Sequence, residues 1–504
     1  MKDGKKVKYN LYMGIAGQIV AVVLGILLPK LILENYGSEV NGLLSSVTNI
    51  YAYIAIVEAG IAAAACQALY KPMAEEDHDR ANEIMAASHR YYRRVGVIYL
   101  ALVCLFATLY PLFIKTEISF GSVVLIILFN GLGNVINFFF HGKYLILLRA
   151  DGKQYVRAGL DMFSVLFKQV AKIVLIHLGF DVVVVQFAAM LTNVIQMLWI
   201  ARYIRRKYPW IDLNAKPDNT ALVQSKYVLA HEVNYLITSN LDAVLLTIFT
   251  NLKVVSIYAL YTTFYDMVTR VLRTIRDALE FKIAYEFHRN MESFRKLFEA
   301  YEVFYITLAF SLFSIVSYFI LSFMRLYTAD VTDINYIDAA LPLLFTFVHL
   351  LAAGRYPSDA MIHIAGHFKE TKNSAMTETL INLGVSIALV QFWGIKGVLL
   401  GTIVSSLYRT NYLIWYVNRN IVMRSVKKTY LCWLVNLAVF VAVAWLNQYI
   451  VVSLDSYVKI FAFCVPYSLC TLAVFFGVMM LCMPRTFWYA VGFMMRALRK
   501  KRAE

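Results

Sequence analysis

The stretch RAGLDMFSVLFKQVAKIVLIHL, residues 157–178, is long and apolar enough to cross a membrane as one helix. It nevertheless contains Arg157, Asp161, Lys168 and Lys172, at spacings of four, seven and four residues. These spacings place the charges along one side of a helix. Because charge is costly in lipid, the stretch predicts a transmembrane helix whose charged side borders a polar interior.

Long apolar segments recur along the whole chain. Windows of about 20 residues, the length that spans a bilayer, detect fourteen of them. They cover residues 9–29, 41–64, 93–114, 121–141, 157–178, 182–203, 225–250, 254–275, 302–324, 338–362, 374–393, 395–417, 429–451 and 457–483. The chain is 60% hydrophobic and 16% charged, whereas soluble proteins contain roughly 25% charged residues. Its mean hydropathy is +0.62. We therefore predict an all-α polytopic membrane protein with about 14 transmembrane helices.

The positive charges lie mostly on one side of these segments. The chain has 48 Lys and Arg and a net charge of +16. Six exceptions lie in loops on the opposite side: Lys30, Lys115, Lys253, Arg325, Lys396 and Lys459. Four more lie within the segments or at their edges: Lys168, Lys172, Lys226 and Arg355. Positive charge beside membrane spans marks the cytoplasmic side, so we interpret the excess as topology and not as nucleic-acid binding.

The charge pattern predicts that both termini lie in the cytoplasm of a bacterial cell, with the chain crossing the plasma membrane many times. Two polar stretches, residues 71–94 and 276–299, would lie on the same side. Both alternate apolar and charged residues, and we interpret them as amphipathic helices lying on the membrane surface.

A shift of 215 residues aligns the first six segments with the next six. Val40 then falls on Val255, each near the start of an apolar segment, and Gly179 falls on Gly394, each in a short outer hairpin. Such a duplication predicts two six-helix bundles of parallel topology, with substrate bound between repeats that rock against each other. The predicted parts are an N-terminal bundle at 1–220, a C-terminal bundle at 221–428, an extra helix pair at 429–484 and a basic cytoplasmic tail at 485–504.

Several short stretches add a family resemblance that covers nearly the whole chain. They read YGSEVNG at 36–42, VEAGI at 57–61, NLD at 240–242, AGHFKET at 365–371 and GIKGV at 394–398. With fourteen segments in two halves and a C-terminal pair, the chain resembles the polysaccharide-transporter branch, the O-antigen and oligosaccharide flippases, of the multidrug/oligosaccharidyl-lipid/polysaccharide flippase superfamily.

The resemblance implies a flippase and not an enzyme. Its members move a polyprenyl-pyrophosphate-linked oligosaccharide from the inner to the outer leaflet by alternating access, for the synthesis of cell-surface polysaccharide. The implied partners are the lipid-linked oligosaccharide, membrane lipids, a polysaccharide polymerase and glycosyltransferases, with no nucleic acid. No cofactor is implied, although proton or sodium coupling is open, and the six cysteines lack metal-ligand spacing.

A diphosphate can cross the hydrocarbon only beside cationic groups, so the charges within the segments are the candidate substrate ligands. Lys168 and Lys172 are the first candidates, the alternatives being an interhelical ion pair or snorkelling to the interface. Arg355 is the next, unless Asp359, one turn away, takes it into a local ion pair. Arg270 and Tyr265 complete the set, although a tyrosine row is also typical of packing or of an interfacial belt.

Three carboxylates are candidates for ion coupling. Asp242 and Glu232 lie in the same segment, where Asp242 is the deeper of the two and Glu232 stands nearer the cytoplasmic end, and Asp266 lies in the next segment. Asp242 could instead pair with an arginine of a neighbouring helix, and Glu232 could be interfacial.

Two other functions are alternatives to the flippase hypothesis. A cation-coupled drug or toxin antiporter of the same superfamily would share the fold but favour an acidic, aromatic cavity without a lysine stripe. A membrane glycosyltransferase or polymerase needs a sizeable soluble domain or loop, and the short loops between these segments leave no room for one.

Overall fold

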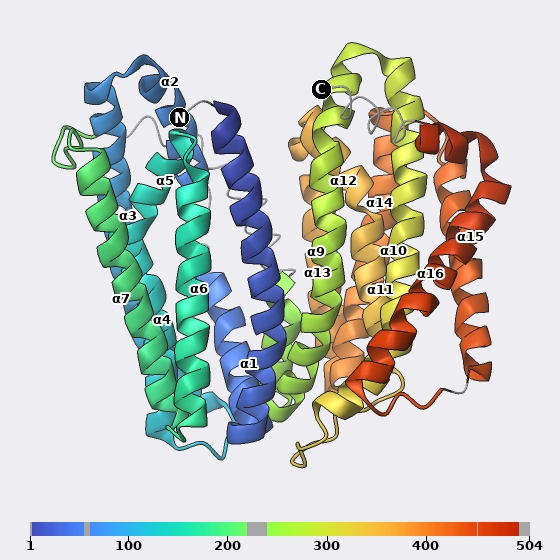
Figure 1. Cartoon of the computed structure of the whole chain (residues 1–504), viewed down its shortest axis with the longest axis horizontal. Helices are drawn as coiled ribbons and strands as arrows, with labels where there is room; N and C mark the ends of the chain where they lie inside the picture. Colours follow the sequence, from blue (N-terminus) through green and yellow to red (C-terminus); the bar gives the residue numbers. More distant parts are fainter. Residues whose placement is uncertain (1–2, 55–60, 219–238, 451, 493–504) are drawn as a thin grey trace. The chain divides into compact units, whose positions relative to one another are not determined.

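The computed structural model describes residues 3–54, 61–218, 239–450 and 452–492, which are overwhelmingly helical and contain no strand (Figure 1). The first group of labelled elements is α1 (Asp3–Ile54), α2 (Ile61–Glu75), α3 (His78–Phe113), α4 (Phe120–Ile136), the π-helical turn η2 (Asn137–His141), α5 (Gly142–Ala150), α6 (Gln154–His177) and α7 (Val182–Lys207). The second is α9 (Leu252–Arg289), α10 (Met291–Tyr327), α11 (Leu341–Gly354), α12 (Tyr356–Ala365), α13 (Phe368–Trp393), α14 (Ile395–Asn420), α15 (Lys427–Leu446), η4 (Asn447–Tyr449) and α16 (Tyr457–Cys482).

Wherever the chain is described, each predicted segment coincides largely with one of these helices or with two consecutive ones, but α3, α9 and α10 extend well beyond the segments 93–114, 254–275 and 302–324. The seventh segment is described only in part, as the helix Ser239–Phe249. By length and composition alone, seven helices of the described chain could cross a membrane: His78–Phe113, Phe120–Phe140, Val182–Lys207, Met291–Tyr327, Phe368–Trp393, Lys427–Tyr449 and Tyr457–Cys482. The predicted class, an all-α polytopic membrane protein, is confirmed.

The prediction of separate surface helices at 71–94 and 276–299 is wrong. Most of the first stretch is the beginning of α3, which continues without a break into the apolar segment. The second stretch is divided between the end of α9 and the beginning of α10, which meet at Asn290. Asn290 caps α10 by accepting hydrogen bonds from the backbone N–H groups of Glu292 and Ser293. Continuing a helix past the apolar segment keeps its backbone hydrogen bonds paired, which a turn there would not.

The helix α1 contains the first two predicted segments, divided by a break at Gly37. This residue has φ 80° and ψ 174°, a conformation that is essentially restricted to glycine. Beside the break, the Tyr36 hydroxyl donates a hydrogen bond of 2.5 Å to the carbonyl oxygen of Phe180, in the turn between α6 and α7. The glycine therefore allows α1 to change direction where the second segment begins.

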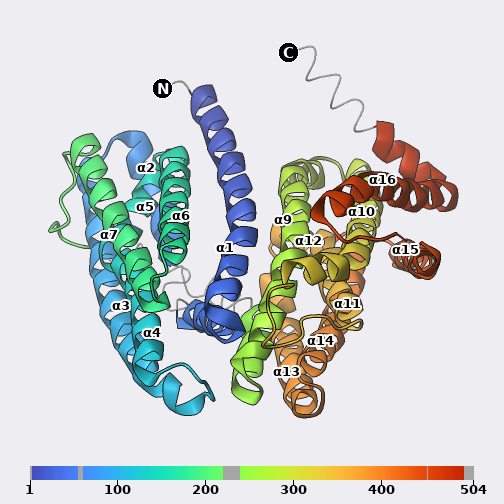
Figure 2. The ribbon, with the colours of Figure 1, turned by 60° about the horizontal axis from the view of Figure 1, so that its bottom comes forward.

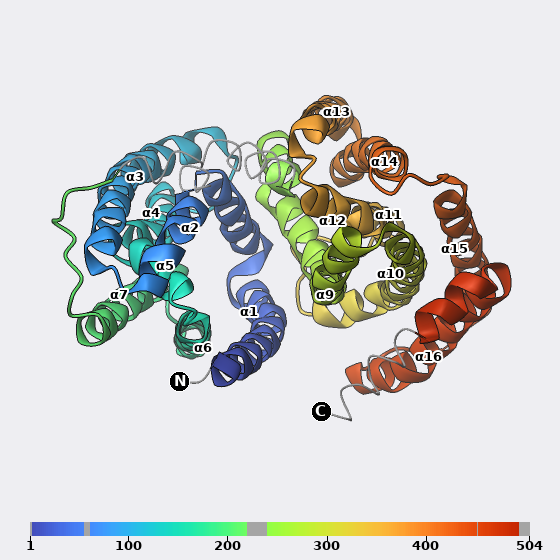
Figure 3. The same ribbon diagram turned by 90° about the horizontal axis from the view of Figure 1, so that it is seen from above.

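The chain forms two compact units, residues 1–259 and 260–504. The boundary that we predicted from the duplication, at 220/221, lies outside the described residues. Within the first unit, α3 and α7 both pack against α4, and α6 packs against α1 and α7 (Figure 3). The apolar core of this unit includes Leu43, Tyr99 and Ile127, each fully buried.

In the second unit, α13 packs along α14, and α11 lies between α10 and α14 (Figure 2). The predicted C-terminal pair is present as α15 and α16, both of which pack against α10. The contact with α16 is an apolar cluster that includes Phe319 and Tyr467. At one end of α15, Arg424 forms an ion pair with the buried carboxylate of Glu302, which also accepts a hydrogen bond from Thr429. The helix pair α15 and α16 is thus held against the rest of the second unit by both apolar and ionic contacts.

Candidate functional site

The helix α6 has two chemically opposite faces, as its charge spacing predicts. On one face, Phe163 and Phe167 are exposed by 67% and 47%, and Val170 and Val174 continue the row. Exposed apolar side chains at spacings of three and four suit contact with lipid. The opposite face carries the four charged residues and turns toward α7 and the interior of the first unit.

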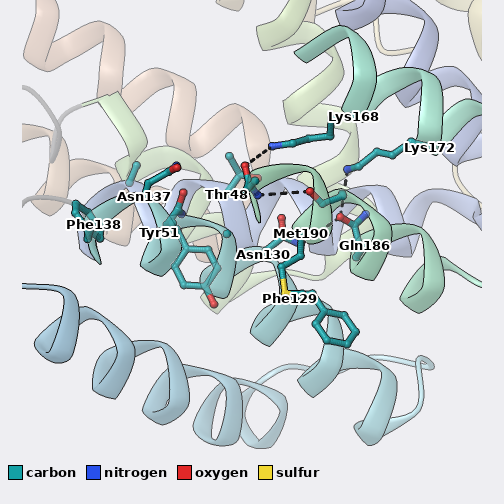
Figure 4. A pocket seen from close by; sticks show the side chains of 15 residues that line it. Thr48, Tyr51, Phe129, Asn130, Asn137, Phe138, Lys168, Lys172, Gln186 and Met190 are labelled. Atoms are coloured by element: carbon teal, nitrogen blue, oxygen red, sulfur yellow. Dashed lines mark hydrogen bonds between the residues drawn. The ribbon is translucent and has the colours of Figure 1, made fainter. Parts of the chain in front are cut away.

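Both lysines of α6 line a cavity of about 470 Å³ within the first unit, which we call the lysine cavity (Figure 4). The Lys168 ammonium donates to Oδ1 of Asn193 at 3.3 Å, and the Lys172 ammonium donates to Oε1 of Gln186 at 3.2 Å. Both amides lie on α7, which faces α6 across the cavity. The remaining lining comes from α1, α4 and η2, and includes the amide of Asn130, which donates to Gln186 at 3.5 Å.

The lysine cavity carries uncompensated positive charge. No carboxylate of the described chain lies within 4 Å of either ammonium group, because Asp161 is engaged elsewhere. Asp161 pairs with Arg157 at 3.5 Å and accepts a hydrogen bond of 3.3 Å from Gln196. Within the described chain, the hydrogen-bond partners of both lysines are neutral amides, which satisfy hydrogen bonds but leave the charge in place. Such a site favours an anion, and phosphate oxygens are the ligands that suit lysine as a point charge.

Close helix packing positions the amide of Asn193. A Cβ atom added to Gly133 of α4 would stand 2.6 Å from Nδ2 of Asn193, so only glycine leaves room for this side chain. Asn193 is buried and also donates to the carbonyl oxygen of Ala189 at 3.4 Å. A rigid, packed partner for Lys168 costs little conformational entropy when a ligand binds.

Asp242, the first candidate for ion coupling, is buried in the helix Ser239–Phe249. Its carboxylate accepts a hydrogen bond of 3.3 Å from the Tyr258 hydroxyl, at the start of α9. Tyr53 of α1 lies within its electrostatic influence. Glu232 lies outside the described residues. Asp266 lies on α9, within the electrostatic influence of Arg270 and Arg273.

Arg355 belongs to an ionic network within the second unit. It stands at the junction of α11 and α12, and pairs with Asp359 at 3.4 Å and with the buried carboxylate of Glu378 on α13. Arg409 of α14 lies 3.7 Å from the same carboxylate and donates to the carbonyl oxygen of Thr371 at 3.2 Å. Two arginines and two carboxylates balance in charge, so the local ion pair that we considered as an alternative is present, and the network joins α12, α13 and α14.

The remaining predicted substrate ligands, Tyr265 and Arg270, belong to the second unit. Tyr265 is fully buried and its hydroxyl is hydrogen-bonded to the carbonyl oxygen of Pro342 at 2.7 Å and to Thr346 at 3.0 Å. Its ring stacks on Phe345, which describes a packing role. Arg270 is exposed on α9. The structure therefore groups Lys168 with Lys172 in the first unit, whereas Arg355, Tyr265 and Arg270 belong to the second.

Sequence reasoning missed the amides of α7 and the arginine of α14. Gln186, Asn193 and Gln196 interrupt an otherwise apolar segment at spacings of seven and three, which is a helical stripe like that of α6. Arg409 interrupts the apolar segment 395–417 in the same way. Uncharged amides attract less notice than lysines, although burying them unpaired would also be costly.

Comparison with known proteins identifies the fold. No family model and no curated protein matches the sequence. Among solved structures, the chain is similar to the lipid II flippase MurJ in an inward closed conformation, with a TM-score of 0.68 at 11% identity, covering 93% of this chain and 99% of that one. It is also similar to an inward-facing multidrug resistance MATE family transporter of the MOP superfamily, with a TM-score of 0.64 at 17% identity, covering 82% and 99%. The chain has the MOP transporter fold.

A third similar structure is the MATE multidrug transporter DinF-BH, solved as a complex, with a TM-score of 0.61 at 14% identity, covering 82% of this chain and 96% of that one. The fold expected from the sequence resemblance is thus confirmed, with its two helical bundles and C-terminal pair. The protein is a multi-pass membrane protein, and the solved structures it is similar to are transporters and a flippase. The likeness includes both a flippase and drug transporters, so the choice of substrate depends on the site.

Proposed function

We propose that this protein is a flippase that moves a polyprenyl-pyrophosphate-linked oligosaccharide from the inner to the outer leaflet. The observation that carries the proposal is the pair of lysine ammonium groups in the lysine cavity, whose described partners are neutral amides. A diphosphate linkage supplies the negative charge that such a cavity lacks, and its oxygens accept hydrogen bonds from lysine. The amides of Asn130, Gln186 and Asn193 add donors and acceptors suited to a sugar or phosphate.

The same observation weighs against the drug antiporter. A cationic drug would be repelled by two ammonium groups without a carboxylate beside them, since like charges repel strongly in a cavity of low dielectric constant. The antiporter hypothesis would instead require the acidic residues to line the transport route. Lipid II, the substrate named for one of the similar structures, is itself lipid-linked, which supports the flippase hypothesis for this chain.

Energetics are compatible with outward movement. With a negative cytoplasm, export of an anionic phosphate is favoured by roughly 2.3 kcal/mol per charge per 100 mV of membrane potential. A coupling ion would then be needed mainly to reset the empty carrier. Polymerase and glycosyltransferases that supply and consume the glycan are the partners proposed for this function.

The test compares charge variants in proteoliposomes loaded with a fluorescent polyprenyl-diphosphate-linked disaccharide. Replacing both cavity lysines, Lys168→Gln with Lys172→Gln, is expected to lower the transport rate by at least about a hundredfold, because each of the two charged hydrogen bonds contributes about 1.5–3 kcal/mol. The matched control is Lys369→Gln with Lys372→Gln, two exposed lysines of α13 that do not line the cavity. The control is expected to transport normally.

The outcome decides between the two transporter classes. Replacing the lysines by arginine keeps the charge and should retain most of the transport. If wild-type protein moves a cationic dye but not the diphosphate-linked disaccharide, and if the glutamine variant moves the dye faster, the protein is a drug transporter and the flippase proposal is wrong.

A further inference from the structure

The outward face of α7 changes from apolar to strongly basic toward its C-terminal end. Exposed apolar residues occupy one stripe, with Leu191 exposed by 42%, Ile195 by 50% and Trp199 by 56%. The same stripe continues with Arg202 and Arg206, at spacings of three and four, and both are exposed. A stripe that is apolar at one end and cationic at the other has the polarity of a membrane lipid with an anionic headgroup.

The basic end of this stripe contains a groove of about 270 Å³, which we call the basic groove. Its described lining comes from α7 alone, and consists of Trp199, Arg202, Tyr203, Arg206 and Lys207. No carboxylate of the described chain lies within 4 Å of any of its three cations. The groove therefore combines a concavity, two aromatic rings and positive charge for which the described chain supplies no counterion.

The basic groove is separate from the lysine cavity. Gln186 and Asn193 point into the cavity from one side of α7. The helical period places Ile195, Trp199 and Arg206 on roughly the opposite side. A ligand in the groove would thus lie against the outer surface of the first unit, where lipid is the surrounding medium, and not in the proposed transport route.

We propose that the basic groove binds an anionic phospholipid from the leaflet at the C-terminal end of α7, with its phosphate between Arg202, Arg206 and Lys207. The indole of Trp199 lies at the boundary, as tryptophan does at membrane interfaces, and the acyl chains follow Leu191 and Ile195. The guanidinium group of arginine can donate two parallel hydrogen bonds to the oxygens of a phosphate. Each basic residue near an anionic membrane surface strengthens binding about fivefold. The three cations together give a selectivity on the order of a hundredfold over a zwitterionic lipid.

Native mass spectrometry of the full chain tests this inference with phosphatidylglycerol and phosphatidylcholine as probes. Wild-type protein is expected to retain phosphatidylglycerol preferentially. The variant Arg202→Gln, Arg206→Gln and Lys207→Gln is expected to lose this preference, with affinity falling on the order of a hundredfold. The matched control, Arg90→Gln, Arg93→Gln and Arg94→Gln, removes the same charge from exposed positions of α3 and should keep the preference.

A second variant guards against misfolding. Trp199→Ala leaves every charge in place and is expected to weaken phosphatidylglycerol binding severalfold, because it removes the aromatic wall. Equal binding of both lipids by the wild type, or equal loss in the α3 control, would overturn the proposal. Displacement of the lipid by millimolar inorganic phosphate would also overturn it, since the groove would then be a site for soluble anions. None of these results depends on which substrate the protein transports.

Discussion

At the scale of single residues, the charges buried in this protein are of two kinds. Lys168 and Lys172 have neutral partners and keep their charge available. Arg355 and Glu378, in contrast, neutralise each other within a network. A charge with neutral partners lowers the stability of the fold unless an anion compensates it. A neutralised ion pair lowers the stability only when one of its members is removed. Charged side chains within the helices are therefore paired with neutral amides in the first unit and with opposite charges in the second.

We expect Glu378→Gln to destabilise the protein strongly. The glutamine would leave the guanidinium groups of Arg355 and Arg409 without their shared carboxylate, and breaking a buried ion pair typically costs about 3–5 kcal/mol. The measurement is thermal unfolding in detergent. The control is Asp338→Asn, which breaks the pair of Asp338 with Lys396, 2.7 Å apart and exposed by 37% and 45%. An exposed pair is worth less than about 1 kcal/mol. Equal effects of the two variants would contradict a structural role for the network.

We expect Asp242→Asn to abolish the dependence of transport on an ion gradient while leaving substrate binding intact. Asparagine keeps the shape of the side chain and can accept the hydrogen bond from Tyr258, but it cannot titrate. Transport in proteoliposomes with and without proton or sodium gradients measures the effect. Tyr258→Phe serves as the control, because it removes the hydrogen bond and keeps the carboxylate. Unchanged ion dependence in Asp242→Asn would leave a uniporter moved by the membrane potential as the simpler mechanism.

At the scale of elements, two local features decide how the helices are used. The amide row of α7 faces the charged row of α6, so each helix pairs the polar groups of the other. The break at Gly37 turns what would be one long helix into two predicted segments. Both features can be read in the sequence as short interruptions of apolar runs.

We expect Gly37→Ala to lower the melting temperature, because alanine is strained at φ 80° and ψ 174° by about 1–3 kcal/mol. The matched control is Gly384→Ala in α13, where an added Cβ meets no atom within 4 Å. Alanine is a better helix former than glycine, so the control should leave the stability unchanged or raise it slightly. A Gly37→Ala protein as stable as the control would show that α1 can continue straight through this position.

At the scale of the whole molecule, the distribution of Lys and Arg predicts the orientation in the membrane. In a variant without native cysteines, we expect a cysteine at Asp330 to react with an impermeant reagent in intact cells, and one at Asn290 to be protected. The two positions flank opposite ends of α10, and both are exposed. Positive charge beside the end at Asn290 predicts that it is cytoplasmic. Labelling of Asn290 alone would invert the topology and exclude our account of the export direction.

Much of the candidate site was predictable because its signals are local. A lysine within an apolar run is costly wherever the chain folds, so Lys168 and Lys172 were identified from spacing alone. Their partners were not, because a lysine can be satisfied by a carboxylate, an amide or phosphate, and only the packing of α6 on α7 selects among these. Arg355 shows the same dependence on packing, since its partner Glu378 lies 23 positions away and meets it only in the folded bundle.

The sequence by itself determined the class of the protein, the positions of its membrane helices and the polar face of α6, since these follow from hydrophobicity and from the period of a single helix. Only the tertiary structure decided that the stretches 71–94 and 276–299 continue the spans, that Tyr265 packs in a core, and that the described partners of the two cavity lysines are amides. These outcomes depend on which faces of the helices are in contact. The packing of many side chains from several helices determines these contacts, and no single segment of the sequence does.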